Sequence, residues 1–150
     1  MRVLGGLRLQ LEDRLVTARK IVELFHLVFV RALFANLQDK RLLALKGGIN
    51  LRFFFQSVRF SEDLDVDVMT MSKAALENRV DRLLASPTVI SPLKTRGIII
   101  RDISKPKQTE MVQRWKLEIA SPSTMLSRSV PRPNRAMYST STSCLLARMR

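Results

Sequence analysis

The stretch RFSEDLDVDV, residues 59–68, concentrates acidic side chains in a chain whose formal net charge is +13. Over residues 64–69, apolar and acidic residues alternate, and this period of two is the pattern of a half-buried β-strand. Side chains two positions apart in a strand point to the same face, so Asp63, Asp65 and Asp67 are expected to share one face. Neighbouring carboxylates repel one another unless a cation or basic groups neutralise them. The stretch therefore needs a positively charged partner.

A divalent metal ion is the simplest partner for such a face. Mg²⁺ prefers oxygen ligands and is commonly shared between one or two protein carboxylates and the phosphates of a substrate. We therefore predict that Asp63 and Asp65 bind Mg²⁺ or Mn²⁺, and that Asp67 is accessory or structural. The alternative is a solvated edge strand whose charges prevent pairing with other chains.

The upstream segment LALKGGINLRF, residues 43–53, favours the metal site. A short apolar run leads into Gly47 and Gly48, and a helix is predicted to begin there. Glycines at a helix N-terminus let backbone N–H groups come close to a phosphate. A glycine pair alone is more often an ordinary turn. Its place directly before an acidic strand makes a phosphate site the better interpretation.

Together, LALKGGINLRF and VRFSEDLDVDV resemble the AbiEii/AbiGii family of bacterial nucleotidyltransferase toxins, within the DNA polymerase beta-like nucleotidyltransferase superfamily. These toxins belong to abortive-infection and type IV toxin–antitoxin systems. The resemblance is strong over residues 42–69 and implies a nucleotidyltransferase-like core. It further implies transfer of a nucleotide from a nucleoside triphosphate to an acceptor such as tRNA or another RNA, and a cognate antitoxin as a partner.

The resemblance also implies roles for individual residues. The glycine turn matches the segment that binds the triphosphate, the Arg-Phe-Ser motif lies near the phosphates, and the paired aspartates bind metal and take part in catalysis. This superfamily usually adds a third catalytic carboxylate on a later strand with apolar neighbours. In this sequence the corresponding residues are Gly47 and Gly48, Arg59 and Ser61, Asp63 and Asp65, and Glu118. Asn50 departs from the family pattern, which has a small residue or Thr there.

Composition limits the class of protein. The 150 residues, 46% of them hydrophobic, are enough for one domain with one core. The excess of basic residues favours RNA, nucleotides or an anionic membrane surface as partners. No uncharged run is long enough to span a bilayer, so we expect no membrane span. The single cysteine, Cys144, excludes an intramolecular disulfide and a Cys-rich zinc site, which makes a reducing, cytoplasmic setting the default.

The remaining periodicity predicts an α+β (α/β-like) fold, a small mixed sheet with flanking helices, over residues 1–120. Helices are expected over about 11–36, after the glycine pair, and from an N-cap at Ser72 to about residue 85, where Pro87 and Pro92 terminate the helix. Strands are expected over 42–47, 64–69, 97–104 and 114–120, the last two joined by a Lys/Pro/Gln loop. His26, alone on an apolar helix, is expected to be a packed residue.

Residues 121–150 have a different composition. They contain no acidic residue, five arginines and many Ser, Thr and Pro residues, so we predict a disordered basic tail. The family's C-terminal helical region has no counterpart in this sequence, which makes a truncated domain a second interpretation. Two hypotheses therefore remain: a metal-dependent nucleotidyltransferase toxin, and a catalytically inactive remnant that binds RNA or nucleotide through its basic surface. Metal-dependent binding of a nucleoside triphosphate distinguishes them.

Overall fold

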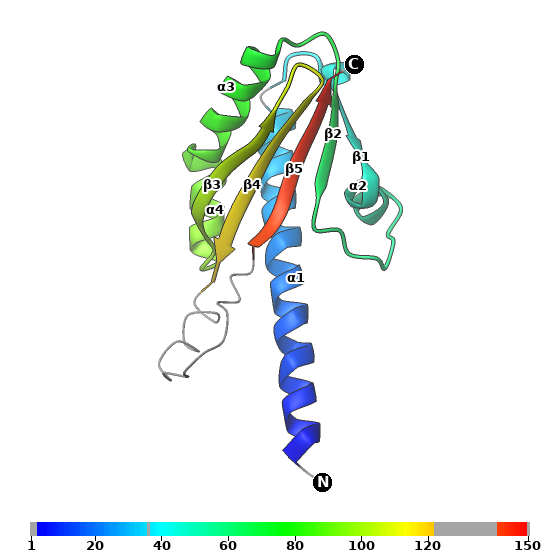
Figure 1. Cartoon of the computed structure of the whole chain (residues 1–150), viewed down its shortest axis with the longest axis vertical. Coiled ribbons are helices and arrows are strands. Elements are labelled where there is room, and N and C mark those ends of the chain that lie inside the picture. The colour runs from blue at the N-terminus through cyan, green and yellow to red at the C-terminus, as the bar shows by residue number, and fades with distance from the viewer. Residues whose placement is uncertain (1–2, 36, 122–140, 150) are drawn as a thin grey trace.

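The computed structural model describes the backbone of residues 3–35, 37–121 and 141–149, and the side chains of 18–35 and 37–121. One five-stranded mixed sheet has the order β1-β2-β5-β4-β3. Helices α1, α3 and α4 pack against one another behind this sheet, and α2 lies beside β1 and β2 at one edge (Figure 1). This arrangement of helices and strands confirms the predicted fold class.

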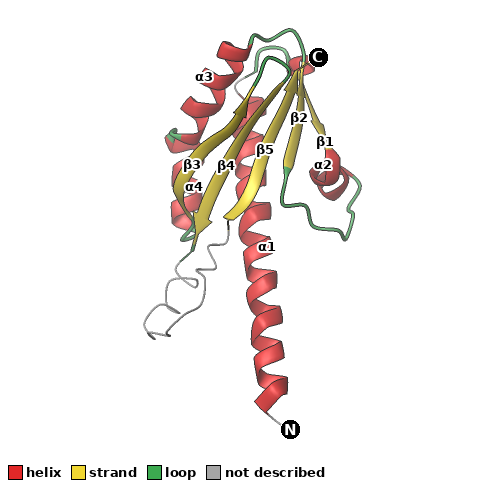
Figure 2. Ribbon diagram, viewed as in Figure 1, coloured by secondary structure: helices red, strands yellow, loops and turns green. Residues whose placement is uncertain are grey.

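The helices are α1 (Val3–Ala35), α2 (Gly47–Phe54), α3 (Lys73–Leu84) and α4 (Pro87–Thr95), with a short 3-10 turn at Lys40–Leu42. The strands are β1 (Leu43–Lys46), β2 (Leu64–Val68), β3 (Ile99–Gln108), β4 (Val112–Ala120) and β5 (Ser141–Met149) (Figure 2). Neighbouring strands are antiparallel except β2 and β5, which are parallel. No helix in the described part of the chain is both long and apolar enough to cross a membrane.

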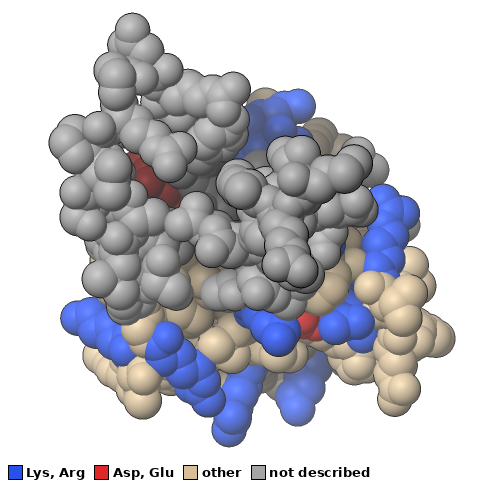
Figure 3. All heavy atoms as spheres, turned by 90° about the horizontal axis from the view of Figure 1, so that it is seen from below, with Lys and Arg blue, Asp and Glu red and all other residues tan. Residues whose placement is uncertain are grey.

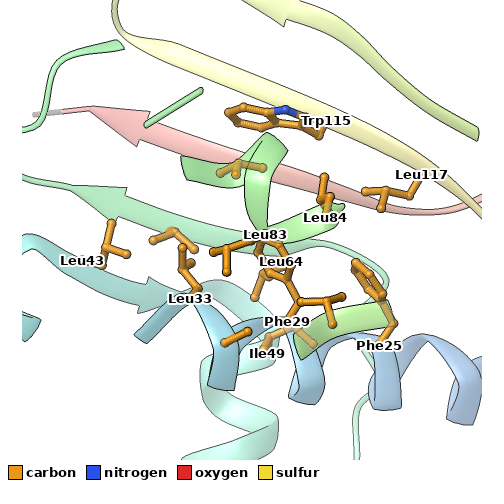
Figure 4. Packing of buried hydrophobic residues seen from close by; sticks show 14 of the residues in the cluster. Phe25, Phe29, Leu33, Leu43, Ile49, Leu64, Leu83, Leu84, Trp115 and Leu117 are labelled. Carbon is orange, nitrogen blue, oxygen red and sulfur yellow. The ribbon is translucent and has the colours of Figure 1, made fainter. Parts of the chain in front are cut away.

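One core lies between the sheet and the helices behind it. The apolar positions of α1 recur every three to four residues, which places them on one side of the helix. From that side Phe25, Phe29 and Leu33 project toward the sheet (Figure 4). The strands contribute their buried alternate residues, Leu64, Val66 and Val68 from β2 and Trp115, Leu117 and Ile119 from β4. The opposite face of the sheet, here called the open face, carries the alternate residues Asp65 of β2 and Arg114, Lys116 and Glu118 of β4.

Most helix boundaries predicted from local sequence signals agree with the structure. Ser72 caps α3, because its hydroxyl oxygen accepts a hydrogen bond from the N–H of Ala75 at 3.2 Å. α3 ends at Leu84 as expected, but the prolines do not leave the following segment without helix. Pro87 instead opens α4, since a proline in the first turn gives up an N–H that has no intrahelical partner there. Pro92 lies inside α4.

The hairpin of β3 and β4 is longer than predicted. The expected loop after Ser104 is part of β3, and the turn comprises only residues 109–111. Thr109 closes this turn, since its N–H donates to the carbonyl oxygen of Val112 at 2.9 Å and its hydroxyl accepts from the N–H of Val112 at 3.0 Å. Pro106 is tolerated because β3 is an edge strand, and the register between β3 and β4 shifts between Ser104 and Lys107.

The prediction of a disordered tail is wrong for Ser141–Met149. These residues form β5, which lies between β2 and β4 inside the sheet. The composition of a segment reports whether it can form a core alone, whereas β5 obtains its hydrogen-bond partners from two strands far away in sequence. Residues 122–140, which carry most of the predicted tail, lie outside the described residues.

Candidate active site

The first glycine of the pair is required both by its backbone and by its neighbour. β1 ends at Lys46 and α2 begins at Gly47, whose φ of 65° is in the left-handed region. A Cβ atom at this position would lie 2.5 Å from Oδ2 of Asp65. Any other residue would be strained in this conformation and would also collide with the carboxylate. The carboxylate of Asp65 therefore lies directly against the glycine turn.

The second glycine makes room for the loop that precedes β2. A Cβ atom on Gly48 would lie 2.8 Å from both Cβ and Oγ of Ser61. The hydroxyl of Ser61 donates a hydrogen bond to the carbonyl oxygen of Asp63 at 3.0 Å, which shapes the chain as it enters the strand. The two glycines thus bring together a helix N-terminus, the Ser61 loop and the start of β2. The first N–H groups of a helix have no partner within it, so this turn is suited to bind an anion.

The acidic residues of β2 have different surroundings. Asp63 is exposed just before the strand, and Asp65 is half-buried on the open face. Asp67 is only 7% exposed and forms an ion pair with Lys46, the last residue of β1. In the antiparallel pairing of β1 with β2, Lys46 also lies directly opposite Asp65. Lys46 therefore supplies positive charge to this face, and its pairing with Asp67 agrees with the predicted structural role of that carboxylate.

Arg59 belongs to the same loop as Ser61. Its side chain is exposed, and its backbone N–H donates a hydrogen bond to Oγ of Ser57 at 3.2 Å. The structure therefore gathers six of the seven predicted residues at one corner of the molecule, where β1, α2 and β2 meet. These residues are Gly47, Gly48, Arg59, Ser61, Asp63 and Asp65.

The structure does not bring Glu118 to this corner. Glu118 lies on β4 opposite Asp102 of β3, and Nη1 of Arg101 is 3.8 Å from one of its carboxylate oxygens. The residue of β4 in line with Asp65 is Arg114, because both lie opposite Leu146 of β5. Glu118 is four residues further along β4, about 13 Å at the usual rise of a strand. Among the residues with described side chains, no group of three or more His, Cys, Asp or Glu residues could hold a metal ion.

A metal site at this corner would thus rest on two carboxylates. Asp63 and Asp65 provide oxygen donors beside a turn suited to phosphate, and Mg²⁺ is commonly held by one or two carboxylates together with substrate phosphates. The donor set therefore fits Mg²⁺ or Mn²⁺ shared with a bound triphosphate.

Two basic residues near the acidic strand were missed by the sequence analysis. Lys46 directly precedes the glycine pair, and a short antiparallel β1–β2 pairing would have placed it against the aspartates. Arg114 could not have been found in this way, because its alignment with Asp65 depends on β5. The composition of residues 121–150 predicted a disordered tail and not this strand.

Comparison with known proteins identifies the family. Residues 29–129 match the family model described as nucleotidyl transferase AbiEii toxin, type IV TA system. The chain belongs to this family. The resemblance inferred from the glycine pair and the acidic strand is thereby confirmed, and the match extends through β3 and β4.

Two solved structures are similar to this AbiEii-family chain. JHP933 from Helicobacter pylori is 27% identical, with a TM-score of 0.50, over 85% of this chain and 44% of that one. A structure described as "putative nucleotidyltransferase from H. pylori" is 28% identical, with a TM-score of 0.48, over 83% of this chain and 44% of that one. The AbiEii-family chain therefore spans less than half the length of either structure. No curated protein matches it.

Proposed function

We propose that this AbiEii-family chain is a metal-dependent nucleotidyltransferase that transfers a nucleotide from a nucleoside triphosphate to an acceptor such as tRNA. The observation that carries this proposal is the contact between the carboxylate of Asp65 and the left-handed Gly47. It puts a candidate metal ligand beside a helix N-terminus, which is the arrangement needed to hold a metal ion and a phosphate together. Family membership supports the same activity.

Each part of the site has a separate task in this proposal. The N–H groups of the glycine turn would bind triphosphate oxygens, and Asp63 and Asp65 would hold Mg²⁺ or Mn²⁺. Such an ion would supply positive charge to the phosphoryl group that is transferred. Lys46 keeps Asp67 paired and adds positive charge next to Asp65. Arg59 is exposed on the loop that carries Ser61, and its guanidinium would bind a phosphate oxygen.

The reaction is a substitution at phosphorus. An acceptor hydroxyl attacks the α-phosphorus of the triphosphate, the bond to the β-phosphate oxygen breaks, and pyrophosphate leaves. Little covalent chemistry falls to the protein, so the rate depends on positioning and charge stabilisation. One carboxylate of the pair can take the proton that the acceptor hydroxyl loses.

Charge and family membership bear on the acceptor and the partners. The excess of basic residues gives a polyanionic acceptor such as tRNA a favourable surface. Lys and Arg side chains are prominent over the described part of the face seen in Figure 3, where few acidic side chains are visible. Membership of a type IV toxin–antitoxin family implies a cognate antitoxin in general. A cytoplasmic location is the one in which both tRNA and triphosphates are available.

A labelling assay tests the proposal. The chain is incubated with Mg²⁺, total tRNA and each of the four labelled nucleoside triphosphates. Asp65→Asn should abolish the labelling of RNA, whereas Asp102→Asn, which changes an exposed aspartate on β3, should leave it intact. Metal-dependent triphosphate binding without any labelling would instead support the remnant hypothesis. If the chain binds no triphosphate with Mg²⁺ or Mn²⁺, the glycine turn does not bind triphosphate and the aspartates do not hold the metal.

A further inference from the structure

The loop that connects α2 to β2 carries three residues of the proposed site but contains no helix or strand. It comprises residues 55–63 and includes Arg59, Ser61 and Asp63. Gln56 directly follows the C-cap of α2 and lies in the left-handed region with a φ of 53°, a conformation common where a helix ends. The loop beyond it forms no helix or strand, so side-chain contacts must hold it beside the glycine turn.

Arg52, on the last turn of α2, makes such contacts. Its Nε donates a hydrogen bond to Oε1 of Glu23 on α1 at 2.6 Å. Its Nη1 donates to the carbonyl oxygen of Ser57 at 2.7 Å, and its guanidinium lies 4.7 Å from the ring centre of Phe60. One side chain thus joins α1, α2 and two points of the loop.

The contacts of Arg52 lie in partly buried surroundings, and further contacts hold the same loop. The side chains of Arg52 and Glu23 are only 27% and 21% exposed, so their attraction is less weakened by water than that of a surface pair. The guanidinium of Arg19 approaches the same Phe60 ring, at 5.7 Å. The N–H of Ser57 also donates to the carbonyl oxygen of Leu51 at 3.1 Å, which ties the loop back to α2.

We propose that Arg52 is a positioning residue of the nucleotide site, which holds residues 55–63 so that Ser61 and Asp63 meet the glycine turn. This inference rests on the proposed nucleotidyltransferase function. Arg52 acts through the loop, by its contacts with Glu23, Ser57 and Phe60. Arginine is required because a planar guanidinium can bind a carboxylate and a carbonyl at its edge while its face lies on an aromatic ring. The single ammonium of a lysine cannot make all three contacts in the same geometry.

Amide exchange and metal binding test this role without depending on turnover. The parent chain is compared with Arg52→Met, Arg52→Lys and Glu23→Gln. The matched control is Lys105→Met, because Lys105 also bonds two acceptors, Glu77 at 2.8 Å and Asp81 at 2.5 Å, but lies far along the chain in β3. The probe is Mn²⁺ with each of the four ribonucleoside triphosphates.

For Arg52→Met we expect about tenfold faster exchange of the Ser57 and Arg59 amides and about tenfold weaker Mn²⁺–triphosphate binding, as the loss of a charged hydrogen bond predicts. Arg52→Lys and Glu23→Gln should shift both quantities in the same direction by less. They also supply the test should Arg52→Met fail to fold. Lys105→Met should lower stability while leaving loop exchange and Mn²⁺ binding unchanged.

Different results would overturn the proposed nucleotidyltransferase function and the positioning role of Arg52. A parent chain that binds no Mn²⁺ with any triphosphate overturns the proposed function, and the positioning role with it. A parent chain that binds while Arg52→Met binds equally well overturns the positioning role alone. Equal losses of Mn²⁺ binding in Arg52→Met and Lys105→Met would also overturn it, since both would then reflect general destabilisation.

Discussion

At the scale of single residues, the candidate site depends on two glycines, which have no side chain, as much as on charged residues. Gly47 leaves space for the carboxylate of Asp65, and Gly48 leaves space for the side chain of Ser61. Sequence reasoning found both glycines and the aspartates because their pattern is local. It chose Glu118 for the third carboxylate because apolar neighbours mark a strand but do not show what the strand lies opposite.

The contact between Gly48 and Ser61 can be measured as a coupling energy. Gly48→Ala places a Cβ atom 2.8 Å from Cβ and Oγ of Ser61, so overpacking should lower the free energy of unfolding by about 1–3 kcal/mol. Ser61→Gly removes both atoms, so the double variant should be more stable than the sum of the single effects by about 1 kcal/mol. Urea unfolding of the four proteins gives the coupling. Strictly additive effects would show that the two residues do not touch.

At the scale of elements, local signals predicted those elements that depend on neighbours in sequence. The alternation of residues 64–69 correctly predicted β2. The glycine pair predicted the start of α2, and Ser72 predicted the start of α3. β5 was not predicted, and α1 begins at Val3, earlier than the predicted start near residue 11. β5 was missed because its pairing is entirely non-local, and the extension of β3 was missed because its lysines and proline indicated a loop.

A proline in β5 tests the position of this strand. Leu145 pairs with Leu64 on β2 and with Trp115 on β4, so its backbone lies between two strands. Leu145→Pro removes an N–H and should lower the free energy of unfolding by about 1–3 kcal/mol more than Leu145→Ala, which keeps it. Amide exchange of β2 and β4 should accelerate in the proline variant. If the proline and alanine variants were equally stable, β5 could not lie in the centre of the sheet.

At the scale of the whole molecule, one apolar core supports a sheet whose open face is polar. His26 is a titratable residue that lies fully buried in this core, and its ring centre is 5.8 Å from that of Phe25. Neither of its ring nitrogens has a hydrogen-bond partner among the described residues. His26 is therefore a packed residue, as expected, and burial makes its charged form unfavourable.

This burial predicts that global stability falls in mild acid. Desolvation lowers the pKa of His26 from 6.5 to about 4. Between these two pH values the unfolded chain binds more protons than the folded chain. The contribution of neutral His26 to the free energy of unfolding is therefore complete above pH 6.5 and is lost as the pH falls toward 4. At 1.36 kcal/mol per pKa unit, the loss is about 3 kcal/mol.

Urea unfolding of the parent and His26→Leu between pH 4 and pH 8 measures this effect. Carboxylates titrate in both proteins, so the difference between their free energies of unfolding isolates the histidine. That difference should shift in favour of His26→Leu as the pH falls from 6.5 to 4 and stay constant above pH 7. A difference that does not change with pH would show that His26 is hydrated in the folded protein.

The position of β5 has a consequence for how the protein is made. β2 and β4 are both synthesised before the strand that lies between them. Until residues 141–149 have been added, each of these strands has an unpaired backbone edge that can pair with another growing chain. The β1–β2 corner that carries the glycine turn can form early from nearby residues, whereas closing the sheet requires a slow, long-range pairing. The newly made chain is therefore most exposed to self-association after its proposed nucleotide site has been synthesised and before its sheet is complete.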